Sequence, residues 1–366
     1  MKNLKSLPII VIGVLISIFF FLSGSNDQEI RAKVLEVSNS EIISSGVGRL
    51  GRQILTIRIL KGPHKGEVLE ATNHLTGSME IDNFYNKGET ILAAIRVQDG
   101  IIKDVQAVDL YRWPSEAGLL LIFIISLVIF AGSIGVRALI SFLASVLIIW
   151  HILIKGVLAG YSPIILTIIV LIILSGVILF SIAGFNRKGL SAFLGTLAGL
   201  MVTAILAYIY GPNMGLNGMT APFAQTLLFK GYININMQEI FFCSIILGAS
   251  GAAMDIAMDI SASIDEIYKK RPDISLKELT QSGFTIGRAV IGTMTTTLLL
   301  AYSGGYITLL MLFASQDTNF IRMTNYKLVS AEVLRILSGS IGLVLVAPLT
   351  AVIAAWIISR EKKENT

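Results

Sequence analysis

The chain of 366 residues is poor in the side chains that most often carry out chemistry. It has one cysteine, Cys243, and three histidines that lie far apart in the sequence. A single cysteine excludes a disulfide within the chain and a cysteine-based metal site, and the histidine spacing matches no zinc motif. A phosphate-binding loop, an HExxH motif and a Gly-x-Ser-x-Gly motif are also absent from the sequence. We therefore expect no metal site, no cofactor and no enzymatic activity.

Charge is scarce as well. Only 14% of the residues are charged, whereas 54% are hydrophobic, and the net charge is +5. The basic residues are spread over the ends of apolar segments and form no clustered face of the kind that follows a phosphate backbone. We therefore exclude nucleic acid as a partner.

What the sequence does contain is a series of long apolar stretches. A bilayer core of ~30 Å requires about 20 apolar residues in a helix, and lipid admits only helices or closed barrels. These stretches lack the alternation of barrel strands. They predict an α-helical polytopic membrane protein, in contact with the lipid bilayer, with about eight transmembrane helices: 7–24, 117–135, 138–158, 163–184, 189–210, 237–258, 284–314 and 330–358.

Lys and Arg near the ends of these stretches indicate the orientation, because short positive loops stay in the cytoplasm. They predict that both termini are cytoplasmic and that residues 25–115 lie outside. Residues 1–24 form an N-terminal anchor; a cleaved signal peptide ending near Ser23–Ser25 is the alternative. Residues 116–359 form a membrane domain of seven helices, and residues 360–366 form a basic cytoplasmic tail.

The segment predicted to lie outside, residues 25–115, is expected to form a small β domain. Leu55, Ile57 and Ile59 alternate with polar residues, which is typical of a half-buried strand. Further short strands are expected at 30–37, 67–72, 90–97 and 101–110, separated by turn residues. Five or six short strands predict a small β-barrel-like domain of OB-like form. Because Arg and exposed aromatics are not interleaved here, we favour a structural or protein-docking role over base stacking.

Charged and hydroxyl side chains concentrate in the last three stretches. Asp255 and Asp259 are four residues apart, so they share a helix face, and Gly248, Gly251 and Ala252 above them are expected to admit a close neighbour. Arg288 is expected at a similar depth near the inner membrane face, paired with one of the aspartates. The remaining members of this candidate substrate or ion path are Thr295, Thr296, Thr297, Glu332 and Arg335.

Two interpretations of these residues remain open. Charges inside a membrane are costly and commonly functional, which favours a polar path. In the alternative, the aspartates reach the membrane surface, Glu332 and Arg335 form an ordinary i,i+3 pair, and the small residues serve packing. An aspartyl protease is disfavoured because both aspartates lie on one helix. The stretch 284–314 is also long for one span, so a break at Ser303-Gly304-Gly305 is expected, with a tilted helix ending at Tyr302 before an apolar loop as the alternative.

These motifs resemble the YibE/F-like family of bacterial multi-pass membrane proteins. The resemblance rests on Gly248–Asp259 with the residues up to Glu266, and on Gly287-Arg288 through Gly305. It implies a permease-like protein of the bacterial cytoplasmic membrane, and a shorter paralogue or a second copy as partner. We therefore expect a permease or secondary transporter of a small solute or ion. The alternative is a membrane assembly or signalling scaffold whose outer β domain binds a partner.

Overall fold

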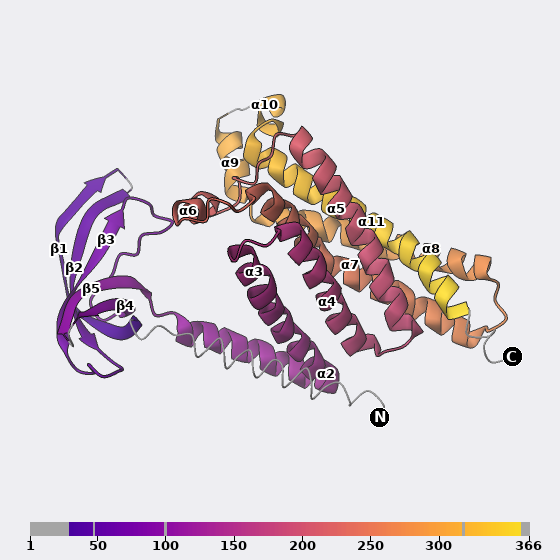
Figure 1. Cartoon of the computed structure of the whole chain (residues 1–366), viewed down its shortest axis with the longest axis horizontal. Coiled ribbons are helices and arrows are strands. Elements are labelled where there is room, and N and C mark those ends of the chain that lie inside the picture. The colour runs from indigo at the N-terminus through magenta and orange to yellow at the C-terminus, as the bar shows by residue number, and fades with distance from the viewer. Residues whose placement is uncertain (1–28, 47, 99–100, 317–318, 360–366) are drawn as a thin grey trace. The chain divides into compact units, whose positions relative to one another are not determined.

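A computed structural model of the chain describes residues 29–46, 48–98, 101–316 and 319–359 (Figure 1). Its contacts divide the chain into two compact units that meet at Gly132, a β-rich unit before it and a helical unit after it. The predicted anchor at 7–24, with its signal-peptide alternative, and the basic tail at 360–366 lie outside the described residues.

The β-rich unit contains the expected barrel. Its five strands close in the order β1-β2-β3-β5-β4, and all neighbouring pairs are antiparallel except β3 and β5. This confirms the prediction of a small β-barrel domain, and OB-folds are likewise five-stranded Greek-key barrels. The strands are β1 (Glu29–Ser45), β2 (Gly48–Ile59), β3 (Val68–Thr76), β4 (Thr90–Gln98) and β5 (Ile101–Leu110).

The barrel core follows from the alternation in β2. Leu55, Ile57 and Ile59 are at most 1% exposed, and they belong to the barrel's buried apolar cluster. A polar residue of the same strand, Gln53, is also fully buried. Its amide donates to the carbonyl of Tyr85 at 2.9 Å and accepts from the Tyr85 N–H at 3.0 Å. Gln53 therefore attaches the loop between β3 and β4 to the barrel wall.

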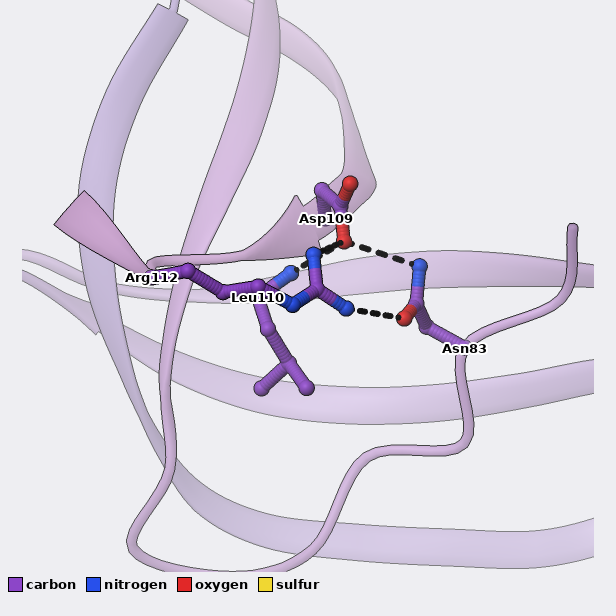
Figure 2. Close-up of polar contacts among 4 residues, drawn as sticks. All are labelled: Asn83, Asp109, Leu110 and Arg112. Atoms are coloured by element: carbon purple, nitrogen blue, oxygen red, sulfur yellow. Dashed lines mark hydrogen bonds and ion pairs between the residues drawn. The ribbon is translucent and has the colours of Figure 1, made fainter. Parts of the chain in front are cut away.

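A second polar cluster joins that loop to the end of the barrel (Figure 2). Arg112 donates to Asp109 at 2.5 Å and to the Asn83 side-chain oxygen at 3.0 Å. The Asn83 amide donates to the same Asp109 oxygen at 3.0 Å, and the Leu110 N–H donates to it at 2.7 Å. One carboxylate thus fixes the loop, the end of β5 and the residue just before the first described helix.

Among the described residues, five helical stretches are long and apolar enough to cross a membrane: Trp113–Leu158, Pro163–Ala183, Arg187–Asn213, Met237–Lys270 and Lys327–Ser359. They consist of α2 (Trp113–Ile148), η2 (Ile149–Ile154), α3 (Lys155–Leu158), α4 (Pro163–Ala183), α5 (Arg187–Asn213), α7 (Met237–Lys270) and α11 (Lys327–Ser359). The remaining helices are α6 (Ala224–Phe229), α8 (Leu276–Gly304), α9 (Ile307–Ser315) and α10 (Phe320–Thr324). The membrane character of the chain agrees with the sequence prediction.

The first stretch contains both predicted spans 117–135 and 138–158. At Gly132 the backbone leaves the helical region, with φ 53° and ψ −128°, a conformation that L-residues rarely adopt. This break leaves about 20 apolar residues on each side, enough for two crossings. The break therefore lies at the glycine and not at the expected boundary near Arg137.

The predicted span 284–314 also differs from a single helix. α8 ends at Gly304 and α9 begins at Ile307, so the expected break at Ser303-Gly304-Gly305 is confirmed, and the alternative of an apolar loop after Tyr302 is wrong. α8 is not among the five apolar stretches, because Arg288 and its threonines lower its hydropathy.

The closest helix packing in the helical unit joins α5 to α11. A Cβ added at Gly199 would overlap Cγ2 of Val346 and stand 3.1 Å from its Cα, and one at Gly342 would overlap the hydroxyl of Thr203. Gly195 and Gly199 form a Gly-x-x-x-Gly pair, which lets helix backbones approach closely. The expectation that Gly251 serves such an approach is wrong for the described chain, since a Cβ there would meet nothing within 4 Å.

The helical unit has two distinguishable ends. Arg187 donates to the carbonyl of Ile357 at 3.1 Å, and the hydroxyl of Tyr268 lies 3.5 Å from the carbonyl of Ser359. The start of α5 and the ends of α7 and α11 therefore lie together. We call this the basic end, because Arg187, Lys188, Lys269, Lys270 and Arg271 lie there. The starts of α4, α7 and α11 form the opposite end.

Candidate functional site

The most deeply buried charge in the helical unit is Glu332 of α11. It is 7% exposed and lies 3.4 Å from Nε of Arg335, one turn further along the helix. The guanidinium of Arg335 stands 5.5 Å from the ring centre of Phe241 in α7. The two charges therefore lie against α7 near the opposite end, and the i,i+3 pairing expected from the sequence is present.

The surroundings of this pair are apolar. The neighbouring buried cluster consists of Ala207, Leu216, Phe241, Phe242, Ile245, Ala331 and Leu334. Besides Arg335, the hydroxyl of Tyr306 interacts with the Glu332 carboxylate. The desolvation cost of a buried ion pair can exceed its Coulombic gain, and replacing such a pair by apolar residues is often neutral or stabilising. The pair is thus a poor stabilising element and a good candidate for a functional one.

Asp259 and Arg288 lie at one level of the bundle. A Cβ at Gly287 would stand 3.1 Å from the Cβ of Ala347 and 3.5 Å from Cδ1 of Ile260. Arg288 follows Gly287 in α8 and Asp259 precedes Ile260 in α7, so these two charged residues lie at the same height along the bundle. Val346, the neighbour of Ala347 in α11, contacts Gly199 of α5. Gly199, Ile260 and Gly287 therefore lie at one height along the bundle, which we call the mid-bundle level. The expectation of a similar depth is confirmed for Asp259 and Arg288, whereas Asp255 lies one helical turn away.

This level lies away from the basic end of the helical unit. Gly199 follows Arg187 by twelve residues, or about 18 Å of helix, and Asp259 precedes Tyr268 by nine residues, or about 14 Å. The charges therefore lie well inside the helical unit and not beside its basic end.

The expected ion pair between an aspartate and Arg288 is not formed. Among the described residues, no ion pair joins Arg288 to Asp255 or to Asp259. All three side chains are exposed. Arg288 lines a cavity of about 250 Å³ on the other side of α8, between that helix and Val344, Ala347 and Pro348 of α11. The pairing was mispredicted because shared depth does not decide which helix faces meet.

The threonines do not line an enclosed path either. Thr296 and Thr297 are exposed, and both hydroxyls donate to the carbonyl of Thr293, at 2.9 and 3.1 Å. The side chain of Thr295 lies outside the described ones. The structure thus separates the predicted residues into a buried pair, Glu332 and Arg335, and an exposed set on α7 and α8.

One polar cavity was not anticipated. At the opposite end, residues 157–163, 231, 232, 234–236 and 239 line an open cavity of about 480 Å³, with Ser162, Tyr232 and Asn236 among them. Glu239 lies in this cavity and accepts from Ser162 at 3.1 Å and from Asn236 at 3.0 Å. The run Asn234-Ile235-Asn236 before α7 is the feature of the sequence that could have indicated this cavity. This cavity gives the opposite end a polar vestibule.

Taken together, a five-stranded barrel followed by apolar helices that bury an ion pair defines a polytopic membrane protein with a β-rich domain. A profile of the YibE/F-like protein family matches residues 119–360, and a profile of the YibE/F family N-terminal domain matches residues 25–108. The chain therefore belongs to the YibE/F-like family, as its motifs suggested. No curated protein and no solved structure matches the chain significantly.

Proposed function

We propose that this protein is a permease or secondary transporter of a small solute or ion. The observation that supports this proposal most directly is the buried Glu332–Arg335 pair, which lies in an apolar part of the helical unit with Tyr306 beside the carboxylate. Intramembrane charges that stabilise little are most often part of a solute or proton pathway. Glu332 would bind a cation or proton, and Arg335 would serve as its counter-ion.

The proposed orientation follows the positive-inside rule. The basic end faces the cytoplasm of a bacterial cell, and eight spans place both termini there. The β-barrel and the polar vestibule around Glu239 then face outward. In this arrangement the vestibule admits solute toward Glu332, and Asp255 and Asp259 would take over a cation at the mid-bundle level. Arg288 would contact an anion.

The competing function is a scaffold whose outer barrel binds a partner protein. The supporting observation is a group of exposed apolar side chains on the barrel: Ile43 (70% exposed), Met79 (72%) and Ile81 (61%). Met79 also lines a cavity of about 240 Å³ with Arg49 and Phe84. Large exposed apolar side chains are a common feature of docking surfaces.

The two functions are separated by replacing the buried pair with apolar residues of similar size. Glu332→Met with Arg335→Met should leave the fold intact, because exchanging a buried ion pair for apolar residues is often neutral or stabilising. We expect this double variant to accumulate normally but to fail to restore the metal and metabolite content of a deletion strain.

The matched control replaces the exposed pair Glu266 and Lys270, 3.5 Å apart, with methionines. That control should restore the wild-type content. The opposite result would be that the Glu332/Arg335 double variant restores the wild-type metal and metabolite content, while a chain lacking residues 29–110 does not. The scaffold function would then explain the data better than the permease function.

A further inference from the structure

A second cavity, which the proposed function does not use, adjoins the polar vestibule. It has a volume of about 430 Å³ and lies between η2, α3, α4, α6 and α7. Apart from Cys243 and Ser244, the side chains that line it are aliphatic or proline. The Ser244 hydroxyl already donates to the carbonyl of Phe241 at 2.7 Å. We call this space the apolar cavity.

The vestibule and the apolar cavity form one site with a polar and an apolar part. Val157, Leu158, Pro163 and Ile235 line both of them, so the two spaces meet along the same short segments of chain. Each volume lies within the range of roughly 300–1,000 Å³ that is usual for small-molecule sites. A ligand that extends through both spaces needs a polar group at one end and an apolar group at the other.

One wall of the apolar cavity is formed by an uncommon element. Ile149, Leu153 and Ile154 belong to η2, the π-helical turn between α2 and α3. Such turns are rare, and they occur frequently at functional sites. The position of η2 is therefore a second observation in favour of a ligand here, and it does not depend on the composition of the cavity.

The charge of the site determines which polar group it accepts. Glu239 is the one charged side chain among the described residues that line the two cavities. One carboxylate oxygen accepts from Ser162 and the other accepts from Asn236. Since a carboxylate offers about four acceptor positions, about two remain for a ligand. Lys155 and Lys230 flank the lining segments, but both are exposed, and the described residues form no ion pair with Glu239. The site therefore favours a cationic group.

The vestibule suits an ammonium group better than a metal ion. Tyr161 and Tyr232 line it, and aromatic rings attract organic cations. Calcium and magnesium ions require several oxygen ligands in a defined geometry, whereas no group of three or more His, Cys, Asp or Glu side chains in the described chain is placed to hold a metal ion. A metal ion would also leave the adjoining apolar cavity unfilled.

We propose that the polar vestibule and the apolar cavity together bind an amphiphilic amine, with its ammonium group beside Glu239 and its alkyl chain in the apolar cavity. This inference rests on the proposed function, in which the vestibule is the entrance, and it names the class of solute. A bilayer phospholipid fits less well, because its phosphate would approach Glu239 where the described lining residues provide no cation.

Equilibrium dialysis of octylammonium against the full chain in nanodiscs of zwitterionic lipid tests the site, with empty nanodiscs to subtract partition into lipid. We expect octylammonium to bind about tenfold or more tightly than octanoate or octanol, because hydrogen bonds to a charged group are stronger than neutral ones. Glu239→Gln keeps the size and an acceptor oxygen of the side chain but removes the charge. It should reduce the affinity for octylammonium to that of octanol and leave octanol binding unchanged.

The length of the alkyl chain tests the apolar cavity. Hexylammonium should bind about fifteenfold less tightly than octylammonium, because each buried methylene contributes about fourfold. Leu153→Trp should largely remove this difference by filling the cavity. Ile205→Trp is the matched control, since Ile205 is 49% exposed on α5, which lines neither cavity. The control should keep the wild-type dependence on chain length.

Three results would overturn the proposal. The first is octylammonium binding no more tightly than octanoate, and the second is equal affinity of wild type and Glu239→Gln for octylammonium. The third is phospholipid that stays with purified wild type and is lost from Leu153→Trp, while octylammonium fails to bind. That result would assign the apolar cavity to bilayer lipid.

Binding and transport are tested separately. If octylammonium binds as expected while the Glu332/Arg335 double variant restores the deletion strain, the proposed function fails and the amine site stands. If octylammonium does not bind while that double variant still fails to restore the strain, the amine site is wrong and the permease stands.

Discussion

At the residue scale, the barrel depends on a few buried polar groups. Gln53 and Asn73 are at most 5% exposed. The Asn73 amide donates to Gln53 Oε1 at 3.2 Å and to the carbonyl of Asn83 at 2.7 Å. Because a buried amide left unpaired costs about 1–3 kcal/mol, these contacts hold the loop between β3 and β4 in one conformation. The loop therefore behaves as part of the barrel wall.

Tyr85 in this loop provides a prediction on pH. Its ring is 1% exposed, and its hydroxyl has no hydrogen-bond partner among the described residues. Burial and the negative charge of Asp109 raise the pKa of Tyr85 from 10.0 to about 12. Since the folded-state pKa is raised, its contribution to stability is complete below pH 10 and is lost as pH rises toward 12.

We expect the tyrosinate absorbance difference between wild type and Tyr85→Phe to titrate well above pH 10. Tyr85→Phe should also weaken the alkaline decline in barrel stability, by at most roughly 2–3 kcal/mol at pH 12. A difference titration centred near pH 10 would mean that the hydroxyl reaches solvent.

At the element scale, glycines determine both where helices stop and where they touch. Gly132 interrupts α2 with a positive φ, and Gly304 ends α8. Gly199 and Gly342, by contrast, lie within helices and bring α5 and α11 into backbone contact. The same residue type therefore serves two purposes, and only its neighbours in space distinguish them.

The α5–α11 contact makes a second prediction. Gly199→Ala places a methyl group on Val346, and such overpacking typically costs about 1–3 kcal/mol. The melting temperature of the detergent-solubilised protein should fall by several degrees. Gly199→Ala with Val346→Ala should recover part of the loss, because the overlapping Cγ2 is removed.

Gly176→Ala is the matched control for this contact. A Cβ there would meet Phe180 and Phe193 at 3.9 Å, an ordinary van der Waals distance. Because alanine is also the better helix former by about 1 kcal/mol, this variant should be as stable as wild type or more so. Equal losses for Gly176→Ala and Gly199→Ala would show that the α5–α11 contact is not tight.

At the scale of the whole molecule, the basic end of the helical unit gathers residues from three helices. The contacts of Arg187 with Ile357 and of Tyr268 with Ser359 place three helix ends together, and basic residues gather there. With the positive-inside rule, this end supports the proposed orientation, in which it faces the cytoplasm.

A topology prediction follows. A reporter fused after Ser40 should read extracytoplasmic, and one fused after Lys270 should read cytoplasmic. Fusion after Lys230, in the loop at the opposite end, should match the Ser40 result. A cytoplasmic signal from the Ser40 fusion would reverse the orientation, and differing signals at Ser40 and Lys230 would contradict the number of spans between them.

Much of this protein was determined by local pattern. The alternation of apolar and polar residues over Leu55–Ile59 predicted a barrel strand, because successive side chains of a strand point to opposite faces. Uninterrupted apolar stretches determined membrane helices, because lipid leaves backbone groups no other partner. The break at Ser303-Gly304-Gly305 and the pairing of Glu332 with Arg335 were also within reach, since both depend on residues close together in the sequence.

Contacts between distant helices were decided only by the tertiary structure. Spacing placed Asp255 and Asp259 on one face of α7, but it could not show that this face is left open or that Arg288 lies against α11. Likewise, Gly251 and Gly199 look alike in sequence, and only Gly199 meets another backbone. The physical reason is that helical periodicity defines which residues share a face, whereas the neighbour of that face is selected by the packing of the whole bundle.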